Sequence, residues 1–230
     1  LLIKQYHDAR GDKKRTKIIV PDSAHGTNPA TAAMCGYEVV NIASGPDGCV
    51  DLESLKAALG DDTAGLMLTN PNTVGIFDKN ILEITRLVHE AGGLCYYDGA
   101  NLNAVMGIVR PGDMGFDCIH MNLHKTFATP HGGGGPGVGP ICVAEHLKAF
   151  LPSHSVMATG GDEGITAVAS APWGSALLLP ITYGYIKMLG EAGLRRATEM
   201  AIVNANYMSA ALASEFRTYY SGETGRVGHE

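Results

Sequence analysis

Lys125 is the residue whose surroundings point most directly to covalent chemistry. It follows a short apolar run, residues 117–122, and precedes a segment in which six of the eight positions 132–139 are glycine. Glycine lets the backbone approach a ligand closely and adopt positive φ angles without a Cβ clash. A lysine amine in such a place can form a Schiff base, so we predict that Lys125 is a covalent catalyst. The alternative is a solvated lysine before a flexible linker.

Asp98 precedes Lys125 by 27 residues, and we predict that each lies at the end of a strand. An aspartate and a lysine in this arrangement fit pyridoxal phosphate. The lysine would bind the cofactor's aldehyde, and the aspartate would pair with the pyridine nitrogen and keep it protonated. His25 is suitably placed to stack on the ring, and Asn70 can donate to the ring's phenolic oxygen.

The rest of the sequence predicts short strands that alternate with helices. Strands are predicted at residues 17–20, 38–42, 65–69, 94–97, 118–121 and 139–143. Helices are predicted at 27–34 with Thr27 or Asn28 as N-cap, at 52–59 with Asp51 as N-cap, and at about 79–91 with Asp78 as N-cap. Residues 171–213 predict two long helices broken near Gly190–Gly193.

The predicted strands are almost continuously apolar, which is typical of a parallel sheet covered by helices on both faces. The fold class is therefore predicted to be α/β with a mainly parallel sheet. In such a sheet, ligands bind outside the carboxyl ends of the strands. Polar segments follow four of the predicted strands, at residues 22–25, 70–72, 98–101 and 122–125. We expect these four segments to converge on one binding site.

Other kinds of site fit the sequence less well. His120, His124 and His131 could suggest zinc, but the i, i+4 spacing of His120 and His124 matters only in a helix, and residues 118–121 are predicted as a strand. The glycine-rich segment is not a Walker A loop, because its lysine precedes the glycines. It does not match the dinucleotide-binding fingerprint either. We therefore expect no metal.

Composition and charge argue against a membrane-spanning protein and against a nucleic-acid-binding one. The chain has 230 residues and a net charge of −6, with no acidic or basic tail and no run of about 18 apolar residues that would suggest a membrane span. Lys13, Lys14 and Arg15 form a short basic cluster that fits a solvated loop better than a nucleic-acid site. Five cysteines without paired spacing indicate a reduced setting, and we expect a bacterial cytoplasmic protein without a signal peptide.

Four stretches together resemble the glycine decarboxylase family, the P-protein of the glycine cleavage system. They are residues 23–30, 68–73, 97–101 and 122–137, within which His124-Lys125-Thr126 and the four glycines at 132–135 are the most family-specific. The resemblance covers essentially the whole chain. It is to the lysine-bearing half of the family, which is the β subunit in two-subunit forms and the C-terminal half in fused forms.

The resemblance implies a fold-type-I pyridoxal-phosphate enzyme. Residues 1–212 would form the large domain, and residues 213–230 would start a small domain, with a strand at 217–220. Lys125 would form the Schiff base, Asp98 would pair with the pyridine nitrogen and His25 would stack on the ring. The remaining cofactor-lining residues that the resemblance implies are Thr27, Asn70, Asn122 and His124.

The resemblance also implies a reaction and its partners. Glycine would lose its carboxylate as carbon dioxide, and its aminomethyl group would pass to the lipoyl arm of the H-protein. No arginine is assigned to the substrate carboxylate, because a salt bridge would stabilise the ground state. The family's lysine-lacking other half would complete the site.

The family's phosphate-binding helix would begin upstream of Leu1, so we interpret the chain as a piece of a longer protein. The piece alone is expected to bind the cofactor weakly and to be inactive, with the loop 131–139 displaced. Two alternatives stay open. One is another fold-type-I enzyme, such as an amino-acid decarboxylase, aldolase or desulfurase, because fold does not fix function. The other is a scaffold half without cofactor, against which Lys125 and Asp98 together argue.

Overall fold

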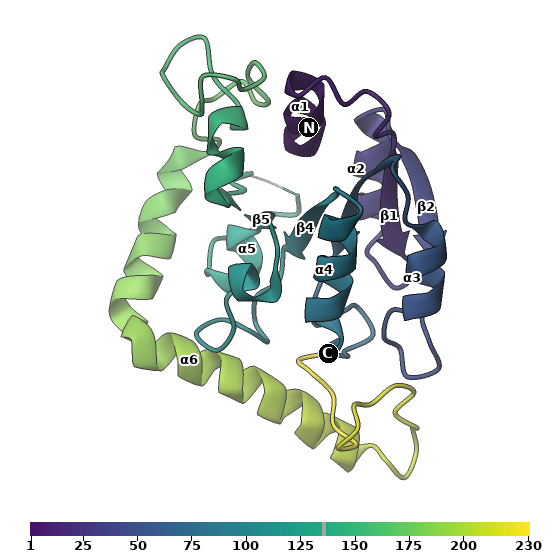
Figure 1. Ribbon diagram of the computed structural model, residues 1–230. Coiled ribbons are helices and arrows are strands. Elements are labelled where there is room, and N and C mark those ends of the chain that lie inside the picture. Colours follow the sequence, from purple (N-terminus) through teal and green to yellow (C-terminus); the bar gives the residue numbers. More distant parts are fainter. Residues whose placement is uncertain (135–136) are drawn as a thin grey trace.

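The protein is built on one six-stranded sheet, seen here in a computed structural model that describes residues 1–134 and 137–230 (Figure 1). The strand order is β2-β1-β3-β4-β5-β6. The pairs from β2 to β5 are parallel, and β6 runs antiparallel to β5. The strands are β1 (Lys17–Pro21), β2 (Glu38–Ile42), β3 (Thr63–Leu68), β4 (Leu94–Gly99), β5 (Cys118–Met121) and β6 (Ile141–Val143). The predicted α/β class and mainly parallel sheet are confirmed.

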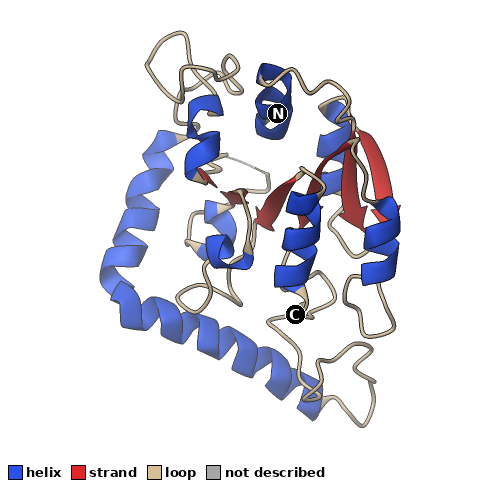
Figure 2. Ribbon diagram, viewed as in Figure 1, coloured by secondary structure: helices blue, strands red, loops and turns tan. Residues whose placement is uncertain are grey.

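Helices cover both faces of this sheet (Figure 2). The α-helices are α1 (Leu2–Ala9), α2 (Thr27–Met34), α3 (Leu52–Ala58), α4 (Ile81–Glu90), α5 (Leu123–Thr126) and α6 (Leu179–Ala211), and the 3₁₀ turns are η1 (Pro111–Met114), η2 (Glu145–Phe150) and η3 (Ala176–Leu178). Ile3 of α1, Ala32 of α2 and Leu147 of η2 pack in one apolar cluster. Leu55 of α3 and Ile84 of α4 belong to a second cluster. The two clusters lie on opposite faces, which explains why the strands are apolar on both sides.

The helix starts only partly follow the predicted caps. Asp51 caps α3 as predicted, because its carboxylate accepts hydrogen bonds from the backbone N–H groups of Glu53 and Ser54. The prediction for α2 is wrong: Gly26 is the N-cap residue, and no side chain caps the helix. Asp78 also lies outside the cap of α4, which begins after Asn80. Its carboxylate accepts instead from the backbone N–H groups of Asn80 and Val50, so it ties two loops together.

The C-terminal third differs from a simple α/β unit. Gly190 has φ 60° and ψ −175°, which breaks α6 into two helical parts where the sequence predicts a break. The strand predicted at 217–220 is absent, because these residues have no strand partner in the described part of the chain. The division of the chain at residue 212 stays a prediction.

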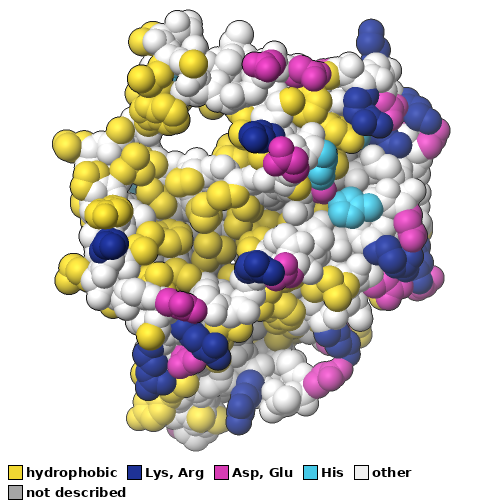
Figure 3. Space-filling model, turned by 60° about the vertical axis from the view of Figure 1, so that its left-hand side comes forward, with side chains coloured by type: hydrophobic (Ala, Val, Ile, Leu, Met, Phe, Trp, Pro, Cys, Tyr) yellow, Lys and Arg dark blue, Asp and Glu magenta, His cyan; other side chains and the backbone are white. Residues whose placement is uncertain are grey.

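A large part of α6 is exposed and apolar. Met188 of α6 is 87% exposed and Tyr207 73%, and Leu177 of the preceding η3 turn is 90% exposed. Figure 3 shows hydrophobic side chains gathered around a hollow on the side of the molecule where α6 lies. Exposed apolar surface on this scale is typical of a protein interaction site. None of the described helices combines the length and apolar character that a membrane crossing requires.

Candidate active site

The carboxyl ends of four parallel strands meet at one cavity of about 600 Å³. His25 and Thr27 follow β1, Thr69 and Asn72 follow β3, and Asp98, at the end of β4, lines the same space. Lys125, after β5, completes the wall. The four polar segments therefore converge, as the sequence predicts, and most of the predicted site residues are brought together.

Lys125 lies on α5, a single helical turn directly after β5. Its side chain is exposed to the cavity, and no carboxylate in residues 1–134 and 137–230 forms an ion pair with it. A hydrogen bond fixes this turn: the hydroxyl of the buried Thr126 accepts from the backbone N–H of Leu102 at 2.9 Å. Ala128, three residues on, has φ 64°, a left-handed conformation that costs a non-glycine residue about 1 kcal/mol. The local backbone is therefore fixed around an amine that has no ionic partner.

Asp98 is 7% exposed and is held by two hydrogen bonds. The side-chain amide of Asn28 donates to Oδ2 at 3.1 Å, and the backbone N–H of Ala100 donates to Oδ1 at 3.0 Å. Asp98 is therefore oriented and suited to pair with a protonated ring nitrogen.

His120, on the neighbouring strand β5, lies beside Asp98. Its ring stacks on Tyr96, and its Nδ1 accepts a hydrogen bond from the Tyr96 hydroxyl, whose pKa is raised by burial. Burial also lowers the pKa of His120, although the Asp98 charge opposes this, so the ring is neutral at pH 7. The proton of the neutral ring is then on Nε2, 3.6 Å from Asp98 Oδ1. His120 therefore lies next to Asp98 without a hydrogen bond to it, a placement that its sequence position did not reveal.

His25 lies at the cavity with its ring fixed. Its Nδ1 accepts a hydrogen bond of 3.1 Å from the backbone N–H of Thr27, which places the proton of a neutral ring on Nε2. The contact replaces the side-chain cap that was expected for α2. An imidazole anchored at one nitrogen and exposed on its face is suited to stack on a planar ring.

The remaining predicted residues divide into two groups. Asn122 and His124 line the cavity, and the His124 ring packs edge-on against His131 at 4.6 Å between centroids. Asn70 does not reach the cavity, since it is fully buried and its side-chain oxygen accepts from the backbone N–H of Asp78 at 2.7 Å. Its side-chain amide also faces Asp78, so Asn70 braces the loop after β3 instead.

Only part of the glycine-rich segment is described. Gly132, Gly133 and Gly134 all have positive φ angles, in line with the expected use of glycine there. Gly135 and Pro136 lie outside the described residues. The expected displacement of the loop 131–139 therefore stays a prediction.

The three histidines considered for zinc have other contacts. His120 bonds Tyr96, while His124 and His131 pack on each other. In the described part of the chain, the group of side chains with metal-ligand geometry is at the opposite edge of the sheet, where His89, Cys95 and Asp117 lie within 4.8 Å of one another. That group is not part of the cavity.

Some polar residues of the site were missed from the sequence, among them Asn28 and His229. Asn28 was considered only as a helix cap, yet it is 2% exposed and bonds Asp98. His229 lines the cavity from the C-terminal tail, 104 positions after Lys125. No local pattern identifies either residue, because both reach the site through long-range packing.

A site for pyridoxal phosphate needs enough space for the cofactor as well as side chains that match its reactive groups. The cavity offers an amine, an oriented carboxylate and an imidazole face around one volume, on Lys125, Asp98 and His25. These groups match the aldehyde, the ring nitrogen and the ring face of that cofactor. The residues present therefore fit the group.

Comparison with known proteins agrees with this geometry. A glycine dehydrogenase (decarboxylating) of Christiangramia forsetii is 54% identical over 233 aligned positions, which cover 100% of this chain and 25% of the relative. A probable glycine dehydrogenase (decarboxylating) subunit 2 of Caldanaerobacter subterraneus subsp. tengcongensis is 55% identical over 224 positions, covering 94% of this chain and 46% of the relative. The chain thus spans about a quarter of the first relative and about half of the second.

A solved structure also resembles the fold. The crystal structure of glycine decarboxylase (P-protein) of the glycine cleavage system, in inhibitor-bound form, has a TM-score of 0.65 and 17% identity, over 92% of this chain and 50% of that one. At this identity the likeness concerns the fold, which is that of fold-type-I enzymes. The family model for the glycine dehydrogenase C-terminal domain matches residues 197–230. The model for aminotransferase class-V matches residues 1–167, and the chain therefore belongs to the aminotransferase class-V family.

Proposed function

We propose that this chain is the cofactor-bearing part of a pyridoxal-phosphate-dependent glycine decarboxylase. The observation that carries the proposal is the meeting of Lys125, Asp98 and His25 around one cavity at the carboxyl edge of the sheet. The names of the similar proteins, glycine dehydrogenase (decarboxylating), support the choice of reaction. The same comparisons support pyridoxal phosphate as the cofactor.

When bound, the cofactor supplies an electron sink for the negative charge that forms as the carboxylate leaves. Lys125 would hold the cofactor through its amine. Asp98, oriented by Asn28 and Ala100, keeps a proton on the ring nitrogen. His25 fixes the plane of the ring, and Thr27, Asn122 and His124 line the space around it.

The aminomethyl acceptor and the partner half are also proposals. We infer that the lipoyl arm of an H-protein reaches the cavity, which is open and exposes Lys125. We infer that the other half of the P-protein covers the apolar surface of η3 and α6, where Leu177 and Met188 are exposed. The five cysteines are free thiols, which supports the bacterial cytoplasm as the location.

A second class of function keeps the cofactor and changes the substrate. A different amino-acid decarboxylase, an aldolase or a desulfurase would use the same Lys125, Asp98 and His25. The glycine dehydrogenase names of the similar proteins favour glycine. A scaffold without cofactor is disfavoured, because an unpaired lysine and an oriented buried aspartate would have no function in it.

The test uses the complete enzyme, with pyridoxal phosphate and lipoylated H-protein. Borohydride should fix the cofactor to the peptide that contains Lys125, and the enzyme should exchange the glycine carboxyl group with labelled bicarbonate. This chain alone should exchange at far below the rate of the complete enzyme. Label on Lys79 or Lys148 would contradict the site, and a complete enzyme that labels Lys125 without exchanging glycine would favour one of the other reactions.

A further inference from the structure

The C-terminal tail forms one wall of the cofactor cavity. His229 and Glu230 line the cavity together with Lys125. The tail is fixed by specific contacts: the backbone N–H of Gly228 donates to the Gly75 carbonyl at 2.8 Å, and the Asn206 side chain bonds both the N–H and the carbonyl of Val227. The position of His229 is therefore set by hydrogen bonds on both α6 and the loop after β3.

His229 is a buried polar group without a partner. Only 8% of its side chain is exposed, and neither ring nitrogen has a hydrogen-bond partner in the described part of the chain. Leaving such a group unsatisfied destabilises the folded protein. The Glu230 carboxylate lies 3.3 Å from Nε2 but does not form a hydrogen bond with it. An imidazole held in a cavity at this cost is suited to a ligand that supplies the missing bond.

The charges around His229 indicate which kind of ligand would supply the missing hydrogen bond. Burial lowers the pKa of His229, and Glu230 opposes this shift, so the ring is neutral at pH 7 and has one acceptor nitrogen. A neutral acceptor beside a carboxylate favours a small cation with N–H donors, such as an ammonium group. The other titratable side chains on the cavity wall are His25, Asp98, His120, His124, Lys125 and His131.

We propose that His229, with Glu230 beside it, receives the ammonium group of the incoming amino acid and removes one proton from it. This inference rests on the proposed function. An N–H bond of the ammonium breaks, its electron pair stays on the substrate nitrogen, and the proton moves to the free ring nitrogen of His229. The Glu230 carboxylate stabilises the imidazolium that forms. The product is the neutral amine, which is the nucleophilic form that can exchange with Lys125.

The kinetic test measures how fast glycine displaces Lys125 in the complete enzyme, from the change in cofactor absorbance after rapid mixing, between about pH 5 and pH 9. In the unaltered enzyme the rate should fall as the pH falls through a value below 6.5, the ordinary value for histidine. His229→Gln should slow displacement by about 10²-fold or more at pH 7 and remove that inflection. Added imidazole should restore part of the rate.

Two matched variants complete the kinetic test. Glu230→Gln should keep the inflection but move it to lower pH, because the imidazolium loses its neighbouring charge. His154→Gln is the control, since His154 is half-buried outside the cavity lining, where its ring bonds the Ser170 carbonyl and the backbone N–H of Val156. Its rates should match the unaltered enzyme. An unchanged rate and pH profile in His229→Gln would overturn the proposal for His229.

A second readout does not depend on the cofactor. In the cofactor-free protein with ¹⁵N-labelled histidine, methylammonium should shift the ring resonances of His229 and leave those of His154 unchanged. No shift at His229 would contradict the recognition of ammonium groups. An enzyme that fails to bind the cofactor at Lys125 would instead contradict the proposed function, and the methylammonium titration would still decide the role of His229.

Discussion

The two edges of the sheet use similar side chains in opposite ways. At the carboxyl edge, Lys125 and His229 both line an open cavity. In residues 1–134 and 137–230, Lys125 has no ion-pair partner and the His229 ring has no hydrogen-bond partner. At the amino edge, the carboxylate of Asp117 accepts from the backbone N–H of Cys95 at 2.6 Å and lies 2.8 Å from Nε2 of His89.

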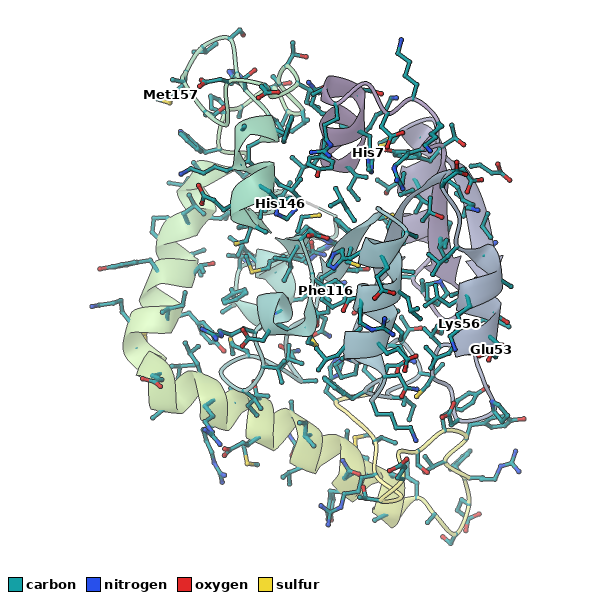
Figure 4. The ribbon with its side chains drawn as sticks, viewed as in Figure 1. His7, Glu53, Lys56, Phe116, His146 and Met157 are labelled. Atoms are coloured by element: carbon teal, nitrogen blue, oxygen red, sulfur yellow. The ribbon has the colours of Figure 1, made fainter. Side chains whose placement is uncertain are left out.

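His146 adds a third contact at the amino edge, 3.2 Å from the other oxygen of Asp117. It lies on η2, on the side of the sheet where His7 of α1 also lies, and both rings pack edge-on against Tyr6 (Figure 4). The polar groups there satisfy one another and connect α4, β4, β5 and η2. The comparison shows that a structural cluster differs from a reactive one mainly in whether its polar groups have hydrogen-bond or ion-pair partners, and less in which residue types it contains.

Lys125→Ala should give the largest effect at the carboxyl edge. Removing a covalent catalyst costs about 10⁴-fold or more in rate, while stability should change by less than about 0.5 kcal/mol because the side chain is exposed. Glycine–bicarbonate exchange and urea unfolding measure the two quantities. Lys148→Ala is the control, since its side chain is 71% exposed and away from the cavity. Normal exchange in Lys125→Ala would contradict the role of the lysine.

Asp98→Asn should separate binding of the cofactor from its chemistry. The substitution keeps the size of the side chain and removes the charge that holds the ring-nitrogen proton, so we expect a loss of about 10²–10³-fold in exchange rate. Cofactor should still be trapped on Lys125 by borohydride. Near-normal turnover in this variant would show that the carboxylate does not act on the ring nitrogen.

Asp117→Ala should have the reverse pattern, a large loss of stability without a direct loss of chemistry. The Cys95 N–H and the His89 ring would lose their acceptor and His146 its nearby charge, which should lower the free energy of unfolding by about 3 kcal/mol. Urea unfolding of this chain measures the change. Asp113→Ala is the matched control, because Asp113 makes only an exposed ion pair with Arg110, and should cost less than about 1 kcal/mol. Equal losses in both variants would contradict the structural role of the cluster.

The same cluster should make stability depend on pH. The hydrogen bond with Asp117 raises the pKa of His89 above its ordinary value of 6.5. A base whose folded pKa is raised contributes stability that is complete below pH 6.5 and is lost as the pH rises through the folded pKa. Because the ring is 38% exposed, the contribution should be under about 1 kcal/mol. His89→Gln should flatten the stability profile above pH 6.5, and a profile identical to the unaltered chain would contradict the linkage.

Ala128→Gly should have the smallest effect and tests the backbone at the carboxyl edge. Relief of the left-handed strain is partly offset by the greater freedom of glycine in the unfolded chain, so a stabilisation of about 0.5 kcal/mol is expected. Thermal unfolding measures it. Ala128→Val should destabilise by more than about 1 kcal/mol, since a β-branched residue is poorly suited to this φ. Destabilisation by glycine would mean that the conformation is not strained.

Much of the architecture could be predicted from sequence because it depends on local pattern. Apolar runs such as 65–69 predict strands that are covered on both faces, and Asp51 predicts the start of α3. Gly190 predicts the break in α6, because glycine accepts a φ of 60° without a Cβ clash. The cap at Asp78 was wrong because the backbone N–H of Val50 competes for its carboxylate, and the cap candidate Asn28 instead bonds Asp98.

The sequence by itself determined that Lys125, Asp98 and His25 stand at the ends of strands, and so at the edge of the sheet where we propose that the cofactor binds. Only the tertiary structure decided which groups serve that chemistry. Asn28 turns inward to Asp98, Asn70 turns away to Asp78, and His229 enters the cavity on a distant tail. The physical reason is that strand-end positions follow from local periodicity, whereas side-chain partners are chosen by packing between segments far apart in the chain.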